Sequence, residues 1–271
     1  MNKVYYRISD NSYKKIKIPG TNKQICLINF LSNFQNFEIN IIADNVNDNT
    51  FDFIKDLSLQ YKNINIERTN YSNAESFNYC LDLALMNDLE TVNYFVEDDY
   101  IHRENSELCI LEGLEKSDYI TLFDHPDKYQ SEYQYGEICK VFKSKNYIWK
   151  TTISTCMTFA VKTKTLKKDY AIFKHYLHNQ QHPNDHLIFC DLKSKGRLLS
   201  LPLPGFAYHT DLTYFKNKKI SDDLIDSWVL KESQNFCLIY LNKYKNLDLE
   251  IEKNENYKQN LSMLDIVLSN Y

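Results

Sequence analysis

Three consecutive acidic residues, Glu97, Asp98 and Asp99, follow directly on an apolar run over residues 94–96. Such a run predicts a buried strand, so the carboxylates are expected at the carboxyl end of that strand. Burying adjacent carboxylates is costly unless a cation compensates their charge. Oxygen ligands of this kind suit Mg²⁺ or Mn²⁺, and both ions pair with phosphates. An exposed acidic loop is the simpler alternative, but the buried preceding strand favours a metal site.

Polar residues also stand at the ends of other strands that the sequence predicts. In an open parallel sheet a ligand binds beyond the carboxyl ends of the strands, so these positions are the first candidates for binding. They are residues 7–10, with Arg7 and Ser9, then Asp44, residues 68–70, and residues 97–100.

The elements that would position these residues alternate between apolar runs and helical stretches up to about residue 125. Strands are predicted over residues 4–8, 37–43, 64–68, 92–96 and 119–123, and helices over residues 23–34, 51–61, 73–86 and 106–115. Strands separated by helices predict right-handed βαβ units. The predicted fold class is therefore α/β, with a mostly parallel central sheet flanked by helices.

The rest of the chain changes character. Residues 129–149 predict a loop or irregular hairpin, 151–161 a strand, 166–178 a helix, 183–193 a second helix and 196–203 a last short strand. We predict one domain over residues 1–215, followed by a helical C-terminal extension over 216–271. That extension could bind the acceptor, pack on the core, pair two subunits or contact a membrane surface.

With these elements in order, the sequence resembles GT-A-fold glycosyltransferases related to family 2. In that fold an Asp-x-Asp-type motif binds the metal that holds the nucleotide-sugar diphosphate, and Glu97-x-Asp99 is similar to it. The family pattern N-x-G-x-x-x-A-x-N is similar to residues 70–78, where Ser72 replaces the glycine and Ser76 the alanine. The resemblance covers roughly residues 3–215.

The resemblance implies a nucleotide-sugar donor, UDP-, GDP- or dTDP-linked, bound in residues 1–125, and a glycan or glycoconjugate acceptor bound in residues 126–215. It implies Mn²⁺ or Mg²⁺ held by Asp99, with Glu97 and His209. Asp44 stands where the family commonly contacts the base or ribose. Together with the strand ends, the expected donor-binding residues are Arg7, Ser9, Asp44, Asn70, Asn73, Asn78, Glu97 and Asp98.

Two segments of the second half resemble further parts of these enzymes. Asp185, at the start of a predicted helix, is similar to the catalytic base of inverting members, which deprotonates the acceptor hydroxyl. An ordinary first-turn aspartate that stabilises the helix is the alternative. Residues 205–211 resemble the segment that supplies a late histidine, here His209, to the metal or diphosphate, although a packed or surface histidine is common. Trp149 is expected near the acceptor, as a sugar platform or as a core residue.

Three other functions are open to the sequence. His125, Asp127, His186 and Arg197 match the ligand pattern of an Fe(II)/2-oxoglutarate oxygenase. That chemistry uses an all-β jelly roll, which the alternating first half disfavours. A sugar-1-phosphate nucleotidyltransferase would share the sheet and acidic site, but it needs a glycine-rich loop, and residues 7–17 contain no glycine. A non-catalytic nucleotide- or glycan-binding protein is the third.

The amino-acid composition argues against several classes of protein. The 271 residues hold only 5 glycines, none clustered, which argues against a Rossmann dinucleotide enzyme and a P-loop NTPase. A net charge of -4 argues against a nucleic-acid-binding protein. The 7 cysteines are scattered without a C-x-x-C pair, which indicates reduced thiols. No signal segment or run of transmembrane length is evident, so we expect a cytoplasmic protein.

Overall fold

The computed structural model describes residues 1–11, 17, 21–124 and 140–211. Its main element is a nine-stranded sheet in the order β3-β2-β1-β4-β9-β6-β10-β8-β7. The strands are β1 (Lys3–Ser9), β2 (Glu38–Asp44), β3 (Ile64–Thr69), β4 (Val92–Glu97), β6 (Tyr119–Ile120), β7 (Val141–Lys143), β8 (Ile148–Thr151), β9 (Phe159–Lys162) and β10 (Leu199–Leu203). A separate two-stranded sheet pairs β5 (Tyr100–His102) with β11 (Ala207–His209).

The predicted α/β class and mostly parallel sheet are confirmed. Strands β3, β2, β1 and β4 are parallel neighbours, and β6 and β10 are also parallel to each other. Only β9 and β8 run against the other strands of this sheet, because their pairings with β4, β6, β10 and β7 are all antiparallel. The carboxyl ends of β1, β2 and β4 therefore meet at one edge, where a ligand site is expected.

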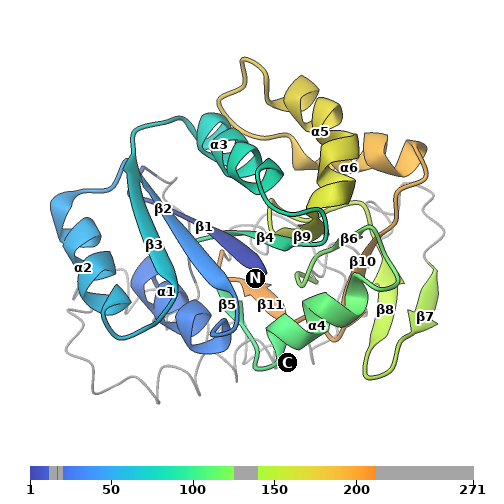
Figure 1. Cartoon of the computed structure of the whole chain (residues 1–271), viewed down its shortest axis with the longest axis horizontal. Helices are drawn as coiled ribbons and strands as arrows, with labels where there is room; N and C mark the ends of the chain where they lie inside the picture. Colours follow the sequence, from blue (N-terminus) through green and yellow to red (C-terminus); the bar gives the residue numbers. More distant parts are fainter. Residues whose placement is uncertain (12–16, 18–20, 125–139, 212–271) are drawn as a thin grey trace, which may run out of the picture.

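Helices cover both faces of the sheet (Figure 1). They are α1 (Lys23–Asn33), α2 (Asp48–Ser58), α3 (Asn73–Leu85), α4 (Ser106–Gly113), α5 (Thr163–Leu177) and α6 (Asp185–Ser194). Side chains alternate along each strand, so Val4 and Tyr6 of β1 enter the core with α1, α2 and α4, whereas Tyr5 enters the core with α3, α5 and α6. Two hydrophobic cores thus hold the sheet between two helical layers.

Asparagine and serine side chains begin several of the helices. Asn22, Asn47 and Asn184 each accept a hydrogen bond from a backbone N–H in the first turn of α1, α2 and α6. Ser72 begins α3 with a full capping box, in which its side chain and that of Glu75 each bond the backbone of the other. These caps set where each helix starts beyond its strand.

Several predicted boundaries are wrong. The single strand predicted over residues 151–161 is two strands, because Cys156 and Met157 adopt φ values of 43° and 59° that no strand residue takes. The strand predicted from Gly196 begins at Leu199, after a glycine at φ 82°. The strand predicted over 119–123 is short, and the helix predicted from residue 183 begins at Asp185. Strands β5 and β11 were not predicted.

The described part of the chain contains no helix long and apolar enough to cross a membrane. None of its five cysteines forms a disulfide. The predicted extension over residues 216–271 lies outside the described residues, as do His125 and Asp127.

Candidate functional site

A cavity of about 360 Å³ opens at the edge of the sheet where β1, β2 and β4 end. Its walls come from these strand ends, from the first turns of α3, and from the segment between α5 and α6. The lining residues are Arg7, Ile8, Ser9, Asn11, Asp44, Asn45, Tyr71, Ser72, Asn73, Ser76, Glu97, Asp98, Asp99, Gln181 and His182. Most of the residues that the sequence predicts for donor binding thus share one cavity.

Arg7 ties the strand ends to helix α3. It faces Glu97 across the parallel β1–β4 pair, and its Nη2 donates to Glu97 Oε1 at 2.5 Å. Its Nη1 donates to the backbone oxygen and to Oδ1 of Asn73, at 2.9 and 2.7 Å. The guanidinium also lies over the Phe77 ring, 5.4 Å from its centroid. Arg7 therefore fixes this wall of the cavity, and Glu97 is already paired with a cation of the protein.

Asp98 is held against the end of β1. Its Oδ2 accepts a hydrogen bond from the Ser9 backbone N–H at 3.0 Å. Burial raises the pKa of the Asp98 carboxyl, and the neighbouring charge of Asp99 raises it further, although Lys17 and Lys23 oppose this. A bound cation would stabilise the ionised form of such a buried carboxyl beside a second acid.

Asp99 is 4% exposed and is joined to the late histidine that the sequence pointed to. His209 Nε2 lies 3.0 Å from Asp99 Oδ2. The β5–β11 pairing brings them together, since it sets His209 opposite Tyr100, and Thr210 donates through its backbone N–H to the Asp99 backbone oxygen at 2.8 Å. The His209 ring also packs 4.9 Å from that of Tyr100.

Asp44 is buried at the end of β2, and its carboxylate is engaged by the protein. Oδ1 accepts from Thr69 Oγ1 at 2.8 Å and from the Tyr71 backbone N–H at 2.7 Å. Oδ2 accepts from Asn45 Nδ2 at 3.0 Å. Asp44 lines the cavity and also fixes the turn from β3 into α3.

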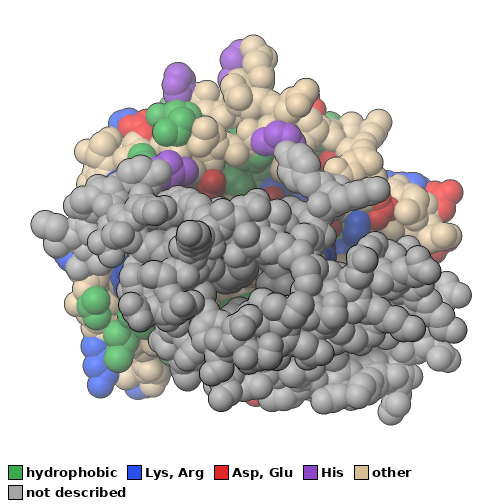
Figure 2. All heavy atoms as spheres, turned by 180° about the vertical axis from the view of Figure 1, so that it is seen from behind, with side chains coloured by type: hydrophobic (Ala, Val, Ile, Leu, Met, Phe, Trp, Pro, Cys, Tyr) green, Lys and Arg blue, Asp and Glu red, His purple; other side chains and the backbone are tan. Residues whose placement is uncertain are grey.

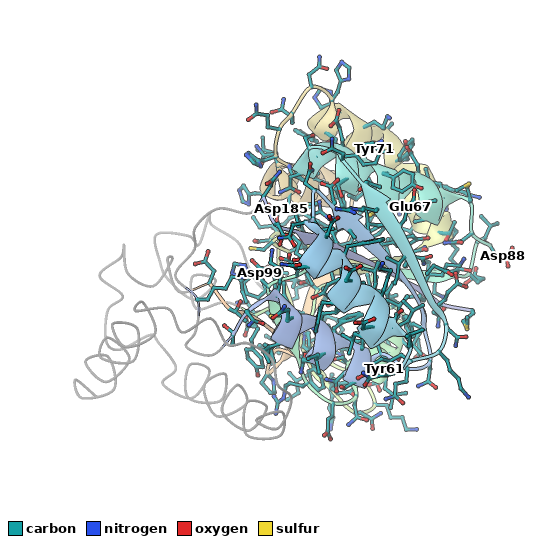
Figure 3. All side chains as sticks on the ribbon, turned by 90° about the vertical axis from the view of Figure 1, so that its left-hand side faces the viewer. Tyr61, Glu67, Tyr71, Asp88, Asp99 and Asp185 are labelled. Carbon is teal, nitrogen blue, oxygen red and sulfur yellow. The ribbon has the colours of Figure 1, made fainter. Side chains whose placement is uncertain are left out.

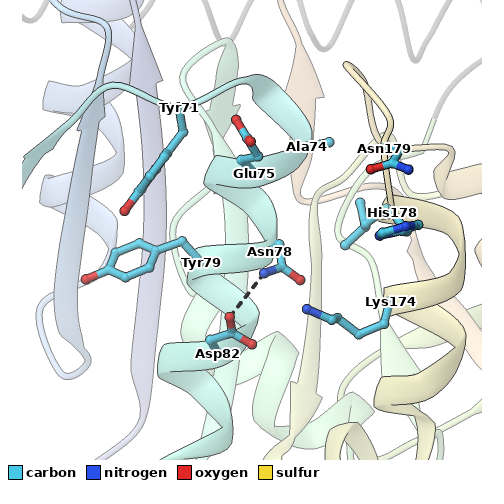
Figure 4. Close-up of a pocket in the computed structure, with 10 residues that line it drawn as sticks. Tyr71, Ala74, Glu75, Asn78, Tyr79, Asp82, Lys174, His178 and Asn179 are labelled. Atoms are coloured by element: carbon cyan, nitrogen blue, oxygen red, sulfur yellow. Dashed lines mark hydrogen bonds between the residues drawn. The ribbon is translucent and has the colours of Figure 1, made fainter.

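Helix α3 divides its polar residues between two cavities. Ser72, Asn73 and Ser76 face the site, whereas Asn78 lines a second cavity of about 410 Å³ between α3 and α5. Figure 4 shows Asn78 there, where its Nδ2 donates to Asp82 Oδ2 at 3.1 Å. Asn70 is exposed and lines neither cavity. The two outer asparagines of the expected motif are therefore not brought together with the site.

Asp185 is the first residue of α6, as the sequence indicates. Its Oδ2 lies 3.4 Å from both the backbone nitrogen and Oγ1 of Thr155. It is not among the cavity-lining residues, but Gln181 and His182, a few residues earlier, are. Figure 3 shows Asp185 and Asp99 on the same side of the molecule, with Asp88, which precedes β4, on the opposite side.

The segment between α5 and α6 supplies lining residues that sequence reasoning missed. Gln181 enters the cavity because its backbone oxygen accepts from the Ala74 N–H at the start of α3, at 3.2 Å. Tyr71, which lines both cavities, was also missed. No local pattern marks these positions, since a long-range contact creates them.

The oxygenase alternative is not favoured. The fold is not a jelly roll, and His186 lies on helix α6. Arg197 forms a bidentate pair with Asp169, with N–O distances of 2.7 and 2.8 Å.

Trp149 is a core residue, because it is fully buried and donates through Nε1 to Ser144 Oγ at 2.7 Å.

Among the described residues, no group of three or more His, Cys, Asp or Glu is arranged to hold a metal. Figure 2 likewise shows the histidine side chains of the face opposite to Figure 1 as separate patches. The donor set does fit Mg²⁺ or Mn²⁺ held in part by a ligand, because such ions are usually bound through one or two carboxylates plus phosphate oxygens. Asp98 and Asp99 are carboxylates of the cavity lining that could serve as such ligands.

No protein-family model and no curated protein matches the chain. Solved structures share part of its fold. S. aureus TarS 1–349 is 16% identical, and the match covers 93% of this chain and 77% of that chain, with a TM-score of 0.49. The galactosyltransferase LgtC, in complex with donor and acceptor sugar analogs, is 10% identical. The match covers 86% of this chain and 95% of that chain, with a TM-score of 0.47. The 4-diphosphocytidyl-2C-methyl-D-erythritol synthase from Anaerococcus prevotii is 14% identical. The match covers 89% of this chain and 96% of that chain, with a TM-score of 0.45.

Because the TM-scores of these three structures lie below 0.5, the likenesses carry no argument about the family or activity of this chain. Whatever function is assigned must therefore come from the cavity itself.

Proposed function

We propose that the chain is a glycosyltransferase that takes a sugar from a nucleoside diphosphate donor and transfers it to a hydroxyl of a glycan or glycoconjugate. The observation that carries the proposal is the composition of the cavity at the carboxyl ends of β1, β2 and β4. Arg7, Ser9, Asp44 and the three consecutive acids share it. A cavity at this edge of an α/β sheet is where nucleotides bind, and the acids suit a cation that accompanies a diphosphate.

The residues have separate roles in this proposal. Asp99, with Asp98, would hold Mn²⁺ or Mg²⁺, which neutralises charge on the departing diphosphate when bound. Glu97 is paired with Arg7, so we assign it to positioning that arginine rather than to the metal. Asp44 orders the β3–α3 turn beside the nucleoside, and His209 orients the Asp99 carboxylate.

Asp185 is the proposed base. Its carboxylate, at the start of helix α6, can accept the proton of an acceptor hydroxyl. That hydroxyl then attacks the anomeric carbon from the face opposite the leaving diphosphate, so the configuration inverts. Its bonds from Thr155, both at 3.4 Å, are long and leave the carboxylate able to exchange partners.

The test is release of nucleoside diphosphate from UDP-, GDP- and dTDP-sugars with Mn²⁺ and a panel of glycan acceptors. We expect turnover with one donor class and an inverted product by NMR. Asp185→Asn should lower kcat about 100- to 10,000-fold with unchanged donor affinity. Asp191→Asn, on the same helix and paired with Lys195, is the matched control and should retain activity.

Three results would point elsewhere. Nucleotide binding without turnover for any donor would indicate a binding protein. Pyrophosphate release from a nucleoside triphosphate and a sugar 1-phosphate would indicate a nucleotidyltransferase. Full activity in Asp185→Asn would remove the base from the mechanism and with it the reason to expect inversion.

A further inference from the structure

The side chain of Ser76 is a buried polar group that the fold itself does not use. Ser76 lies on α3, is 1% exposed and lines the cavity at the strand ends. No described residue forms a hydrogen bond with its Oγ. A buried hydroxyl without a partner destabilises the fold, so such a group needs an explanation.

A helical serine ordinarily has a partner nearby. Its hydroxyl can bond the backbone oxygen four residues earlier, and Ser32 on α1 does so, donating to the Ile28 oxygen at 2.8 Å. For Ser76 that oxygen belongs to Ser72, which accepts only the Ser76 backbone N–H, at 2.8 Å. The two serines thus differ: the Ser32 hydroxyl bonds its own helix, whereas the Ser76 hydroxyl has no partner among the described residues.

Several polar groups around Ser76 are already engaged by the protein. The Asn73 oxygens accept from Arg7, and the backbone N–H groups of Ala74 and Glu75 bond Gln181 and Ser72. Ser76 Oγ is therefore a buried group on this wall of the cavity that has no hydrogen-bond partner among the described residues. A ligand oxygen or amino group would supply the partner, because a hydroxyl both donates and accepts.

We infer that Ser76 Oγ hydrogen-bonds the nucleotide bound in this cavity. The inference rests on the proposed function, since that function supplies the nucleotide. It predicts opposite effects of Ser76→Ala on stability and on affinity. Removing an unsatisfied hydroxyl and raising helix propensity should raise Tm, by about 2 °C. Removing its bond to the nucleotide should weaken binding about three- to tenfold.

The experiment measures Tm without ligand, and Kd by calorimetry for UDP, GDP and dTDP with Mn²⁺, in wild type, Ser76→Ala and Ser32→Ala. We expect higher Tm and weaker binding for Ser76→Ala. Ser32→Ala should keep the wild-type affinity without a rise in Tm, because it loses a made bond. Titrating the matching nucleoside monophosphate locates the contact: loss with both ligands places it on the nucleoside or the α-phosphate, and loss with the diphosphate alone places it on the terminal phosphate.

A fall in Tm for Ser76→Ala would overturn the inference, since it would mean that the hydroxyl stabilises the fold. Unchanged affinity in Ser76→Ala, with wild type binding one nucleotide, would also overturn it while leaving the proposed function intact. A wild-type protein that binds none of the three nucleotides would overturn the proposed function and this inference with it.

Discussion

Replacing Arg7 by methionine should destabilise the fold because Arg7 joins β1, β4 and α3 at one point. Its bond to Glu97 is charge-assisted and 2.5 Å long, but the Glu97 side chain is 25% exposed and can regain water. Because this exposure weakens the ion pair, we expect it to contribute about 1–2 kcal/mol to the free energy of unfolding. The two bonds to Asn73, also an exposed partner, add about 1 kcal/mol. The expected loss in the free energy of unfolding is therefore about 2–3 kcal/mol, or a fall in Tm of about 4–12 °C.

Thermal and urea unfolding of Arg7→Met measure this loss, and the chain offers a matched control. Lys3 stands at the other end of β1 and makes a single bond to Glu38 at 3.1 Å, also across neighbouring parallel strands. Lys3→Met should cost less than about 1 kcal/mol. A double-mutant cycle of Arg7→Met with Glu97→Gln should return a coupling of about 1–2 kcal/mol. An Arg7→Met protein no less stable than Lys3→Met would refute the assignment of Arg7 as the link between these elements.

Three further substitutions test separate parts of the account. Asp98→Asn should raise Tm at pH 7 without metal. The pKa of Asp98 is higher in the folded than in the unfolded state, so the wild-type protein loses stability as pH rises and this carboxyl ionises. At pH 3 the carboxyl is largely protonated, and the difference in Tm between variant and wild type should vanish. Gly113→Ala should cost about 1–3 kcal/mol in chemical denaturation, because the added Cβ would lie 2.5 Å from Trp149 Cη2. Arg197→Met should lower Tm through loss of its Asp169 pair while leaving nucleotide affinity unchanged, whereas an oxygenase role predicts altered 2-oxoglutarate binding.

Much of the site could be predicted because it lies at strand ends. A buried apolar run followed by acids marks both a strand and its carboxyl end, and parallel pairing then brings Arg7, Asp44 and the acids together whatever the loops do. The same logic predicted the fold class. It succeeded because sheet order and helix placement follow from long periodic segments.

The errors have identifiable structural causes. Asn78 was grouped with Asn73, but positions 73 and 78 differ by about 140° around a helix, so one face of α3 cannot hold both. Gln181 could not be predicted, because a single bond to the Ala74 N–H places it. The contact between His209 and Asp99 depends on two three-residue strands, which are too short to carry a periodic signal.

The central claim is that the acids at the end of β4 form a cation-dependent nucleoside diphosphate site. The most direct measurement is a thermal-shift titration of wild type and Asp99→Asn with UDP, GDP and dTDP, each with and without Mn²⁺. We predict that one nucleotide raises Tm only with Mn²⁺, by about 5–10 °C at 100 times its Kd, and that Asp99→Asn loses this rise. A shift that is independent of Mn²⁺ and unchanged in Asp99→Asn, or no shift with any nucleotide, would contradict the account.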